Sequence, residues 1–318
     1  GNTNGWSDWS DEFVFHSKAL APALIFPKNN ATNVSIAPRL EWNGVADGGP
    51  WRLQLSENAD FQQVLEDTLI SQSYYSVIGL EEAMVYYWRV RVEHEATNSE
   101  WTEDSFTTRP APETVDINNY TIGFEGVAES DYRLISVPGL ESLDPQEIFE
   151  GEYGTDWRIV WDNGESENYF EEYNEQNNPF RFEAGKAYWA LSRENVTITH
   201  NSESVKPKAN DVYPISVHPG WNLISNPFIH EVSWEDVQEL NNLTESLWAY
   251  EDSYQQSQKL IPLSGYYIYN DPAASRDTLY IPYNPPGMQK SKKSIENYTK
   301  VGVNQGKATE NHKIKLTA

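Results

Sequence analysis

The chain has 318 residues, a formal net charge of −25 at pH 7 and no cysteine, with aromatic residues at 13% and charged residues at 22%. This is the composition of a folded protein rather than of a disordered chain. The negative charge disfavours nucleic acid as a partner, the lack of cysteine excludes disulfides and thiolate metal sites, and no apolar run is long enough to span a membrane.

Residues 1–18 contain SDWSDEFVF, which repeats the tryptophan, acidic and phenylalanine order of SEWTEDSFTT at 99–108. We therefore expect residues 1–18 to be the last strand of a preceding β-sandwich domain. The Trp-Ser-Asp-Trp-Ser spacing at 6–10 is associated with cytokine receptors, but a second β-rich region follows it instead of a membrane span. The absence of cysteine also argues against a disulfide-bonded receptor ectodomain.

Residues 19–109 alternate apolar and polar positions over short segments separated by turn-rich sequence, which predicts an all-β unit. In YYWRVRV (86–92), the apolar side chains of Tyr86, Trp88, Val90 and Val92 share one face of the strand. This region resembles a fibronectin type III domain of the bacterial extracellular kind. The segments that carry the resemblance are PKNNATNVSIAPRLEW, WRLQLSENADF, GLEEAMVYYWRVRV and SEWTEDSFTT. The resemblance implies an immunoglobulin-like β-sandwich.

A proline-rich stretch, TTRPAPETVD (107–116), precedes an internal repeat whose copies we place at 110–205 and 206–284. Each copy predicts a strand, a short helix, two aromatic strands and a last strand. The matched segments are YRLISVPG and WNLISNPF, DPQEIFE and SWEDVQEL, WRIVWDNG and SLWAYEDS, FEAGKAYWAL and IPLSGYYIYN, and NVTI and TLYI. Gly185 and Gly265 precede the second aromatic strand, where a permissive backbone is needed. The two copies are expected to pair into one pseudo-symmetric, mainly β domain.

These segments resemble a tandem GWNLISNPF-type module of secreted multidomain proteins of Bacteroidota. The resemblance implies an extracellular or cell-surface location, export by the type IX secretion route and an accessory role, and it assigns chemistry to no residue. Residues 285–318 are rich in lysine and poor in aromatic residues. We predict that they form a linker that leads into a further β domain.

No catalytic constellation is evident in the sequence. There is no Gly-x-Ser-x-Gly nucleophile elbow, and the six histidines are scattered without the spacing of a zinc-binding helix. We therefore predict no catalytic residue, no metal site and no cofactor, and we do not expect this segment to be an enzyme. With 48 acidic residues, adjacent carboxylates such as Glu171 and Glu172 are expected by chance.

Aromatic rings are the strongest remaining signal, and they allow two interpretations. Most of them can fill the core, or some can stand outside a strand and stack on a sugar or a protein. For a ligand site our candidates are Trp161, Trp248, Tyr250 and Tyr254, which we expect at equivalent positions of the two copies. Asp67-Thr68-Leu69 and Asp277-Thr278-Leu279 match an O-glycosylation sequon of exported Bacteroidota proteins, so Thr68 and Thr278 are predicted acceptors.

Together these patterns favour a non-catalytic accessory segment of a large secreted or cell-surface bacterial protein. It would act as a spacer and as a module that contacts protein or glycan. Its expected partners are other domains of the same polypeptide and a surface glycan or protein. Two alternatives stay open: a carbohydrate-binding module that targets a peptidase or glycosidase encoded outside this segment, and a subunit of an extracellular assembly or filament.

Overall fold

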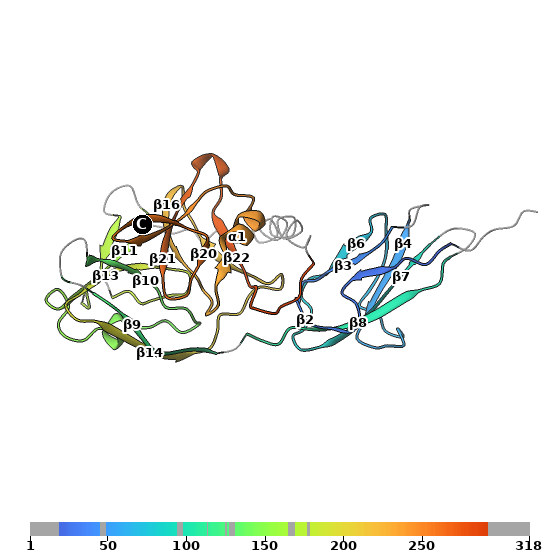
Figure 1. Ribbon diagram of the computed structural model, residues 1–318, viewed down its shortest axis with the longest axis horizontal. Helices are drawn as coiled ribbons and strands as arrows, with labels where there is room; N and C mark the ends of the chain where they lie inside the picture. The colour runs from blue at the N-terminus through green and yellow to red at the C-terminus, as the bar shows by residue number, and fades with distance from the viewer. Residues whose placement is uncertain are drawn as a thin grey trace, which may run out of the picture. The chain divides into compact units, whose positions relative to one another are not determined.

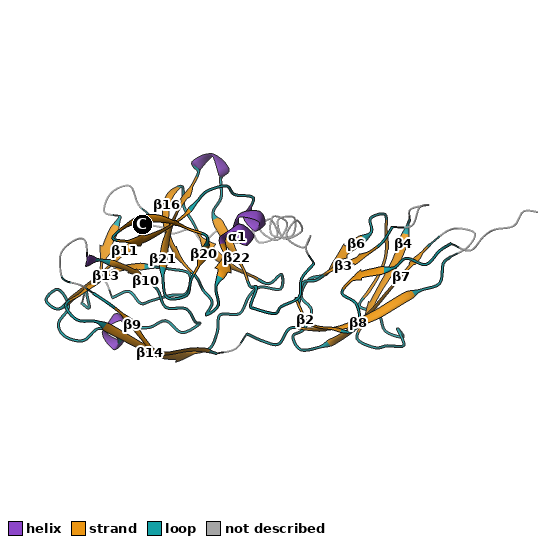
Figure 2. Ribbon diagram, viewed as in Figure 1, coloured by secondary structure: helices purple, strands orange, loops and turns teal. Residues whose placement is uncertain are grey.

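The computed structural model describes residues 19–44, 49–93, 98–112, 114–124, 126, 131–164, 169–176 and 179–291. The chain forms two compact units, in which strands predominate (Figures 1 and 2). Unit 1 contains Leu40–Tyr75, Val85–Thr107 and the described residues up to Ala31, and unit 2 contains Thr32–Arg39, Ser76–Met84 and the described residues from Thr108 onwards. The predictions for residues 1–18 and 292–318 lie outside the described residues.

The first eight strands form two sheets. In sheet order, they are β1 (Leu24–Phe26), β3 (Arg39–Trp42) and β6 (Tyr74–Ser76), and then β2 (Ala31–Val34), β8 (Thr102–Thr108), β7 (Val85–Val92), β4 (Trp51–Ser56) and β5 (Glu66–Ile70). Trp42 of one sheet meets Trp88 of the other, with ring centroids 6.4 Å apart. This strand order, with the core between the sheets, is that of an immunoglobulin-like β-sandwich. The prediction of a mainly β fold is confirmed.

The alternation in the sequence of strand β7 gives the strand a buried face and an outer face. Tyr86, Trp88, Val90 and Val92 are buried. On the opposite face, the Arg89 and Arg91 guanidinium groups each lie 4.5 Å from the centroid of the Trp101 ring. A cation–π arrangement therefore lies on the outer face of this sheet.

In unit 2, two four-stranded sheets have the same strand order, as the sequence repeat predicts. The first is β10 (Arg133–Ile135), β13 (Tyr188–Ser192), β11 (Trp157–Asp162) and β12 (Phe170–Glu172), and the second is β16 (Gly220–Ser225), β21 (Gly265–Asn270), β18 (Leu247–Glu251) and β19 (Ser253–Ser257). Each sheet has a two-stranded companion, β9 (Val115–Ile122) with β14 (Val196–Ser202), and β15 (Val212–Ser216) with β22 (Thr278–Pro282). We call the two sets of strands the first and second copy.

The copies differ in their short elements. The first has the 3-10 turn η2 (Pro145–Glu147), whose N-cap is Asp144. The second has the helix α1 (Trp234–Asn241), the strand pair β17 (Val232–Ser233) and β20 (Lys259–Leu260), and the 3-10 turn η3 (Pro272–Ala274). Helix α1 buries Trp234, Val237 and Leu240, which recur at helical spacing on one face.

Strand register identifies the equivalent residues. Trp189 pairs with both Leu134 and Val160. Tyr267 pairs with both Leu223 and Trp248. Trp189 and Tyr267 are therefore equivalent, and Trp248 corresponds to Val160.

The register corrects two of the expected equivalences. Trp161 corresponds to Ala249 and not to Tyr250, with which the sequence match aligns it. The match was wrong by one residue, which moves a side chain to the other face of a strand. Gly185 corresponds to Leu263 and not to Gly265. Both Gly185 and Leu263 have a positive φ, at 83° and 66°.

The copies exchange backbone contacts in a pseudo-two-fold manner. Ile135 bridges to Ser264, and the equivalent residues Ile224 and Lys186 form the matching bridge. The N–H of Ser136 donates to the Leu263 carbonyl at 3.2 Å, and in the other direction the N–H of Ser225 donates to the Gly185 carbonyl at 2.9 Å. Each copy thus supplies strand-edge partners to the other.

Each copy has its own apolar core, and a third cluster joins them. The first core contains Trp157, Tyr188 and also Leu263 of the second copy. The third cluster buries Leu134, Ala187, Leu223 and Tyr267, which lie on the faces that the two sheets turn toward each other. Gly265 is required at this place, because a Cβ there would lie 2.6 Å from the Ala187 Cβ.

Candidate ligand-binding cleft

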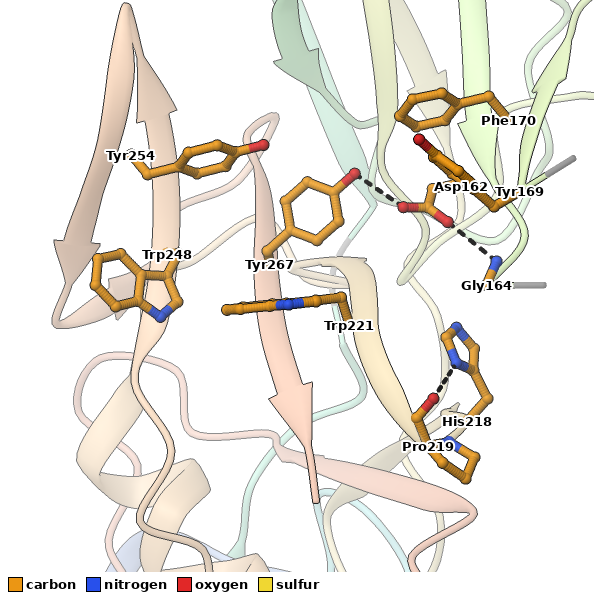
Figure 3. Close-up of a pocket in the computed structure, with 10 residues that line it drawn as sticks. All are labelled: Asp162, Gly164, Tyr169, Phe170, His218, Pro219, Trp221, Trp248, Tyr254 and Tyr267. Carbon is orange, nitrogen blue, oxygen red and sulfur yellow. Dashed lines mark hydrogen bonds between the residues drawn. The ribbon is translucent and has the colours of Figure 1, made fainter. Parts of the chain in front are cut away.

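A cleft of about 670 Å³ opens in unit 2 where the face of the second copy's sheet that carries Leu223 and Tyr267 meets the end of strand β11. Its side chains come from both copies (Figure 3). The lining residues are Asp162, Gly164, Tyr169, Phe170, His218, Pro219, Trp221, Trp248, Tyr254 and Tyr267. A volume of this size is within the range of about 300–1,000 Å³ that is typical of small-molecule sites.

Four aromatic rings on adjacent strands of the second copy form one wall. Trp221 lies on β16, Tyr267 on β21, Trp248 on β18 and Tyr254 on β19. They share a face because side chains alternate along each strand, while Leu247 turns to the core. Trp221 is 50% exposed and Tyr254 is 55% exposed, so both rings present surface to a ligand.

The opposite wall comes from the end of the first copy's β11–β12 hairpin. Tyr169 and Phe170 are about half exposed, and their ring centroids lie 4.4 Å apart. Asp162, the last residue of β11, stands between the walls (Figure 3). The cleft therefore has rings on two sides and a carboxylate between them.

A short chain of hydrogen bonds fixes this carboxylate. The Trp189 indole Nε1–H donates to the Tyr267 hydroxyl at 3.0 Å, and that hydroxyl donates to Asp162 Oδ2 at 3.0 Å. Asp162 Oδ1 accepts the N–H of Gly164, also at 3.0 Å. Burial is the main cause that raises the pKa of Tyr267, and the nearby Asp162 charge adds to it, so the hydroxyl stays protonated.

His218 and Pro219 close the lower end of the cleft in Figure 3. His218 Nδ1 lies 3.0 Å from the Pro219 carbonyl oxygen. A carbonyl only accepts, so Nδ1 carries a proton and donates in this contact. A Cβ on Gly164 would overlap the His218 ring, and Gly164 also has a φ of 75°. Glycine is therefore needed there on both counts.

The structure brings two of the four ligand candidates into the cleft. Trp248 and Tyr254 line it. Tyr250 lies beside it, with its ring centroid 5.2 Å from that of Tyr254 and 4.9 Å from that of Trp189. Trp161 is not in the lining, because it turns to the core side of β11, where Lys186 Nζ lies 4.5 Å from its ring centroid.

Trp221, Asp162 and His218 line the cleft but were not among the candidates from the sequence. Trp221 precedes Leu223 by two residues, so alternation alone places it on the face that Leu223 shares. No sequence pattern marks Asp162 among 48 acidic residues. Among the described residues, no group of three or more histidine, aspartate or glutamate side chains is arranged to hold a metal ion.

The two predicted glycosylation acceptors lie within strands. Thr68 is on β5, at the end of the five-stranded sheet, and Thr278 is on β22. Both are half-buried, and the Thr278 hydroxyl donates to its neighbour Asp277 at 2.9 Å. Their glycosylation stays a prediction.

Comparison with known proteins adds little to this geometry. No protein-family model matches the chain, and no curated protein matches it. A solved structure of the FN1–FN3 domains of chicken CNTN1 is similar at 14% sequence identity, over 83% of this chain and 99% of that one, with a TM-score of 0.22. A score that low carries no argument, so the sandwich assignment rests on strand order. No helix in the described part of the chain is long and apolar enough to cross a membrane.

Proposed function

We propose that this chain is a non-catalytic accessory segment of a secreted or cell-surface bacterial protein, in which the β-sandwich is a spacer and unit 2 binds a glycan in the aromatic cleft. The observation that carries the proposal is the cleft itself, in which half-exposed rings from both copies face a fixed carboxylate. The resemblance to secreted modules supports the location.

A glycan suits this arrangement because a sugar ring has two kinds of surface. Its C–H faces stack on flat aromatic rings, and its edge carries hydroxyl groups that donate hydrogen bonds. Trp221 and Tyr254 supply exposed rings, and Asp162 supplies acceptor oxygens between the walls. Few polar groups in a largely aromatic pocket are typical of a site that orients a small ligand.

Binding without hydrolysis is the simpler role for these residues. Glycoside hydrolysis ordinarily uses two carboxyl groups about 5–10 Å apart. The described lining of the cleft holds one, Asp162, which is engaged with Tyr267 and Gly164. This supports a targeting or adhesive function.

A glycan array probed with the full chain tests the proposal. We expect at least one glycan to bind, and we expect its affinity to fall at least about tenfold in Trp221→Ala and Trp248→Ala, because one stacked aromatic contact contributes roughly 1.4 kcal/mol or more. Tyr120→Ala is the matched control, since Tyr120 is 41% exposed on β9 outside the cleft lining. No binding on the array, or equal affinity in all three variants, would rule out this function.

A further inference from the structure

The polar atoms of the cleft are unevenly divided between donors and acceptors. Asp162 is the one carboxylic side chain among the described lining residues, and no lysine or arginine is among them. A carboxylate only accepts hydrogen bonds, and each of its oxygens has room for more than the one bond it makes here. A ligand that meets Asp162 must therefore donate.

The neighbouring groups reinforce this bias. The single hydroxyl proton of Tyr267 is already given to Asp162, so Tyr267 has none left for a ligand anion. His218 Nδ1 donates to the Pro219 carbonyl. Asp162 thus offers acceptor atoms to a ligand, while the Tyr267 hydroxyl proton and the His218 Nδ1–H are already engaged.

Basic side chains near the cleft are paired elsewhere. Lys186 lines a neighbouring cavity together with Asp162, but its Nζ lies 3.0 Å from a Glu183 carboxylate oxygen and over the Trp161 ring. The chain as a whole carries a net charge of −25. An anionic ligand would meet both a local and a general repulsion.

We infer that the cleft is specific for uncharged sugars, with a ring hydroxyl donating to Asp162, and that it excludes uronate, sialylated and sulfated glycans. This inference rests on the proposed glycan-binding function and adds the chemical class of its ligand. Rejection comes from the unpaired negative charge that an anionic sugar would place beside the Asp162 carboxylate.

The experiment compares two sets of hexasaccharides against the full wild-type chain by isothermal titration calorimetry. The neutral set is cellohexaose, mannohexaose and xylohexaose, and the acidic set is hexagalacturonate and hexaguluronate. We expect at least one neutral ligand to bind and both uronates to bind at least about tenfold more weakly, which corresponds to roughly 1.4 kcal/mol.

Two carboxylate variants connect the result to the cleft. Asp162→Asn removes the charge with little change of shape. We expect this variant to reduce the ratio of the affinity for the best neutral ligand to the affinity for the uronates at least fivefold. Asp252→Asn is the matched control, because Asp252 loses the same charge between β18 and β19, with a side chain that is 79% exposed and outside the cleft lining. We expect that control to leave the ratio of the two affinities unchanged.

The outcomes separate the two proposals. If a uronate binds as tightly as the best neutral ligand, the assignment of the ligand class is wrong and glycan binding stands. The same conclusion follows if Asp162→Asn keeps its thermal transition but does not change the ratio of the two affinities. If neither set binds, glycan binding itself fails. The wild-type comparison decides the class even if Asp162→Asn does not fold.

Discussion

The two copies of unit 2 share a strand order but use their facing surfaces differently. Asp162 and Tyr250 are equivalent, since each pairs with an equivalent hairpin residue, Phe170 or Tyr254. Asp162 places a small carboxylate against Tyr267, whereas Tyr250 places a whole ring against Trp189. One side of the pseudo-two-fold arrangement is therefore open as a cleft, and the other is packed. Different side chains at matched positions therefore separate a binding surface from a structural one.

The largest effect should come from removing the ring at the centre of the packed side. Trp189→Ala takes away contacts with Tyr132, Tyr250 and Tyr267 and the indole donor to Tyr267. We expect it to lower the free energy of unfolding by about 3 kcal/mol. Trp221→Ala, on the open side and half exposed, should cost about 1 kcal/mol or less. Chemical denaturation measures both, and equal losses would contradict the assignment of packed and open sides.

A second prediction concerns how the stability of the second copy depends on pH. His230 stacks on Phe228 of the second core, and burial lowers its pKa from 6.5 to about 4. The unfolded chain takes up a proton below pH 6.5 and the folded one does not until about pH 4. The contribution of the neutral His230 to the free energy of unfolding is therefore fully present above pH 6.5. It is lost as the pH falls toward 4, by up to about 1.4 kcal/mol per pH unit.

The His230→Phe variant keeps a ring against Phe228 but has no titrating group. Between pH 6.5 and 4, the free energy of unfolding should fall more steeply in the wild type than in this variant. Carboxylates titrate in both proteins, so the difference between the two slopes isolates His230. Parallel slopes would show that His230 does not titrate in the way its burial implies.

The smallest expected effect lies on the hydrogen-bond chain that fixes Asp162. Tyr267→Phe leaves the Trp189 Nε1–H and one Asp162 oxygen without this partner, and we expect a loss of about 1–2 kcal/mol. Tyr250→Phe, which removes the same hydroxyl group from a ring on the packed side, is the control and should cost less than about 0.5 kcal/mol, because the contribution of Tyr250 is ring packing. Thermal unfolding of the two single variants is the measurement.

The sequence was sufficient for the class of fold and for the order of the matched segments in the repeat, but it did not predict β9, β12, β15 and β19. Alternation in YYWRVRV correctly predicts the buried face of β7, because strand period and burial coincide there. Similarly, the repeated LIS segments mark β10 and β16, which occupy the same place in their sheets. These are strong signals because each depends on several residues in a row.

Register was harder to predict, and the site depends on register. A gapless match of WRIVWDNG with SLWAYEDS aligns Trp161 with Tyr250, whereas the strand pairing aligns Asp162 with Tyr250. The match of Gly185 with Gly265 was also wrong, because the two glycines meet different structural requirements. One is a positive φ, met by Gly185 and Leu263, and the other is a close approach, met by Ala187 and Gly265. Residue identity alone does not distinguish these causes.

The crossed strand-edge contacts at Ile135 and Ile224 have a consequence for how this region is divided. A fragment ending after β14 would lack Leu263 from its core, and its Ser136 N–H would have no Leu263 carbonyl to bind. A fragment that starts at β15 would expose the Ser225 N–H in the same way. The segment that is duplicated in the sequence is thus smaller than the segment that can fold by itself, and expression boundaries belong outside both copies.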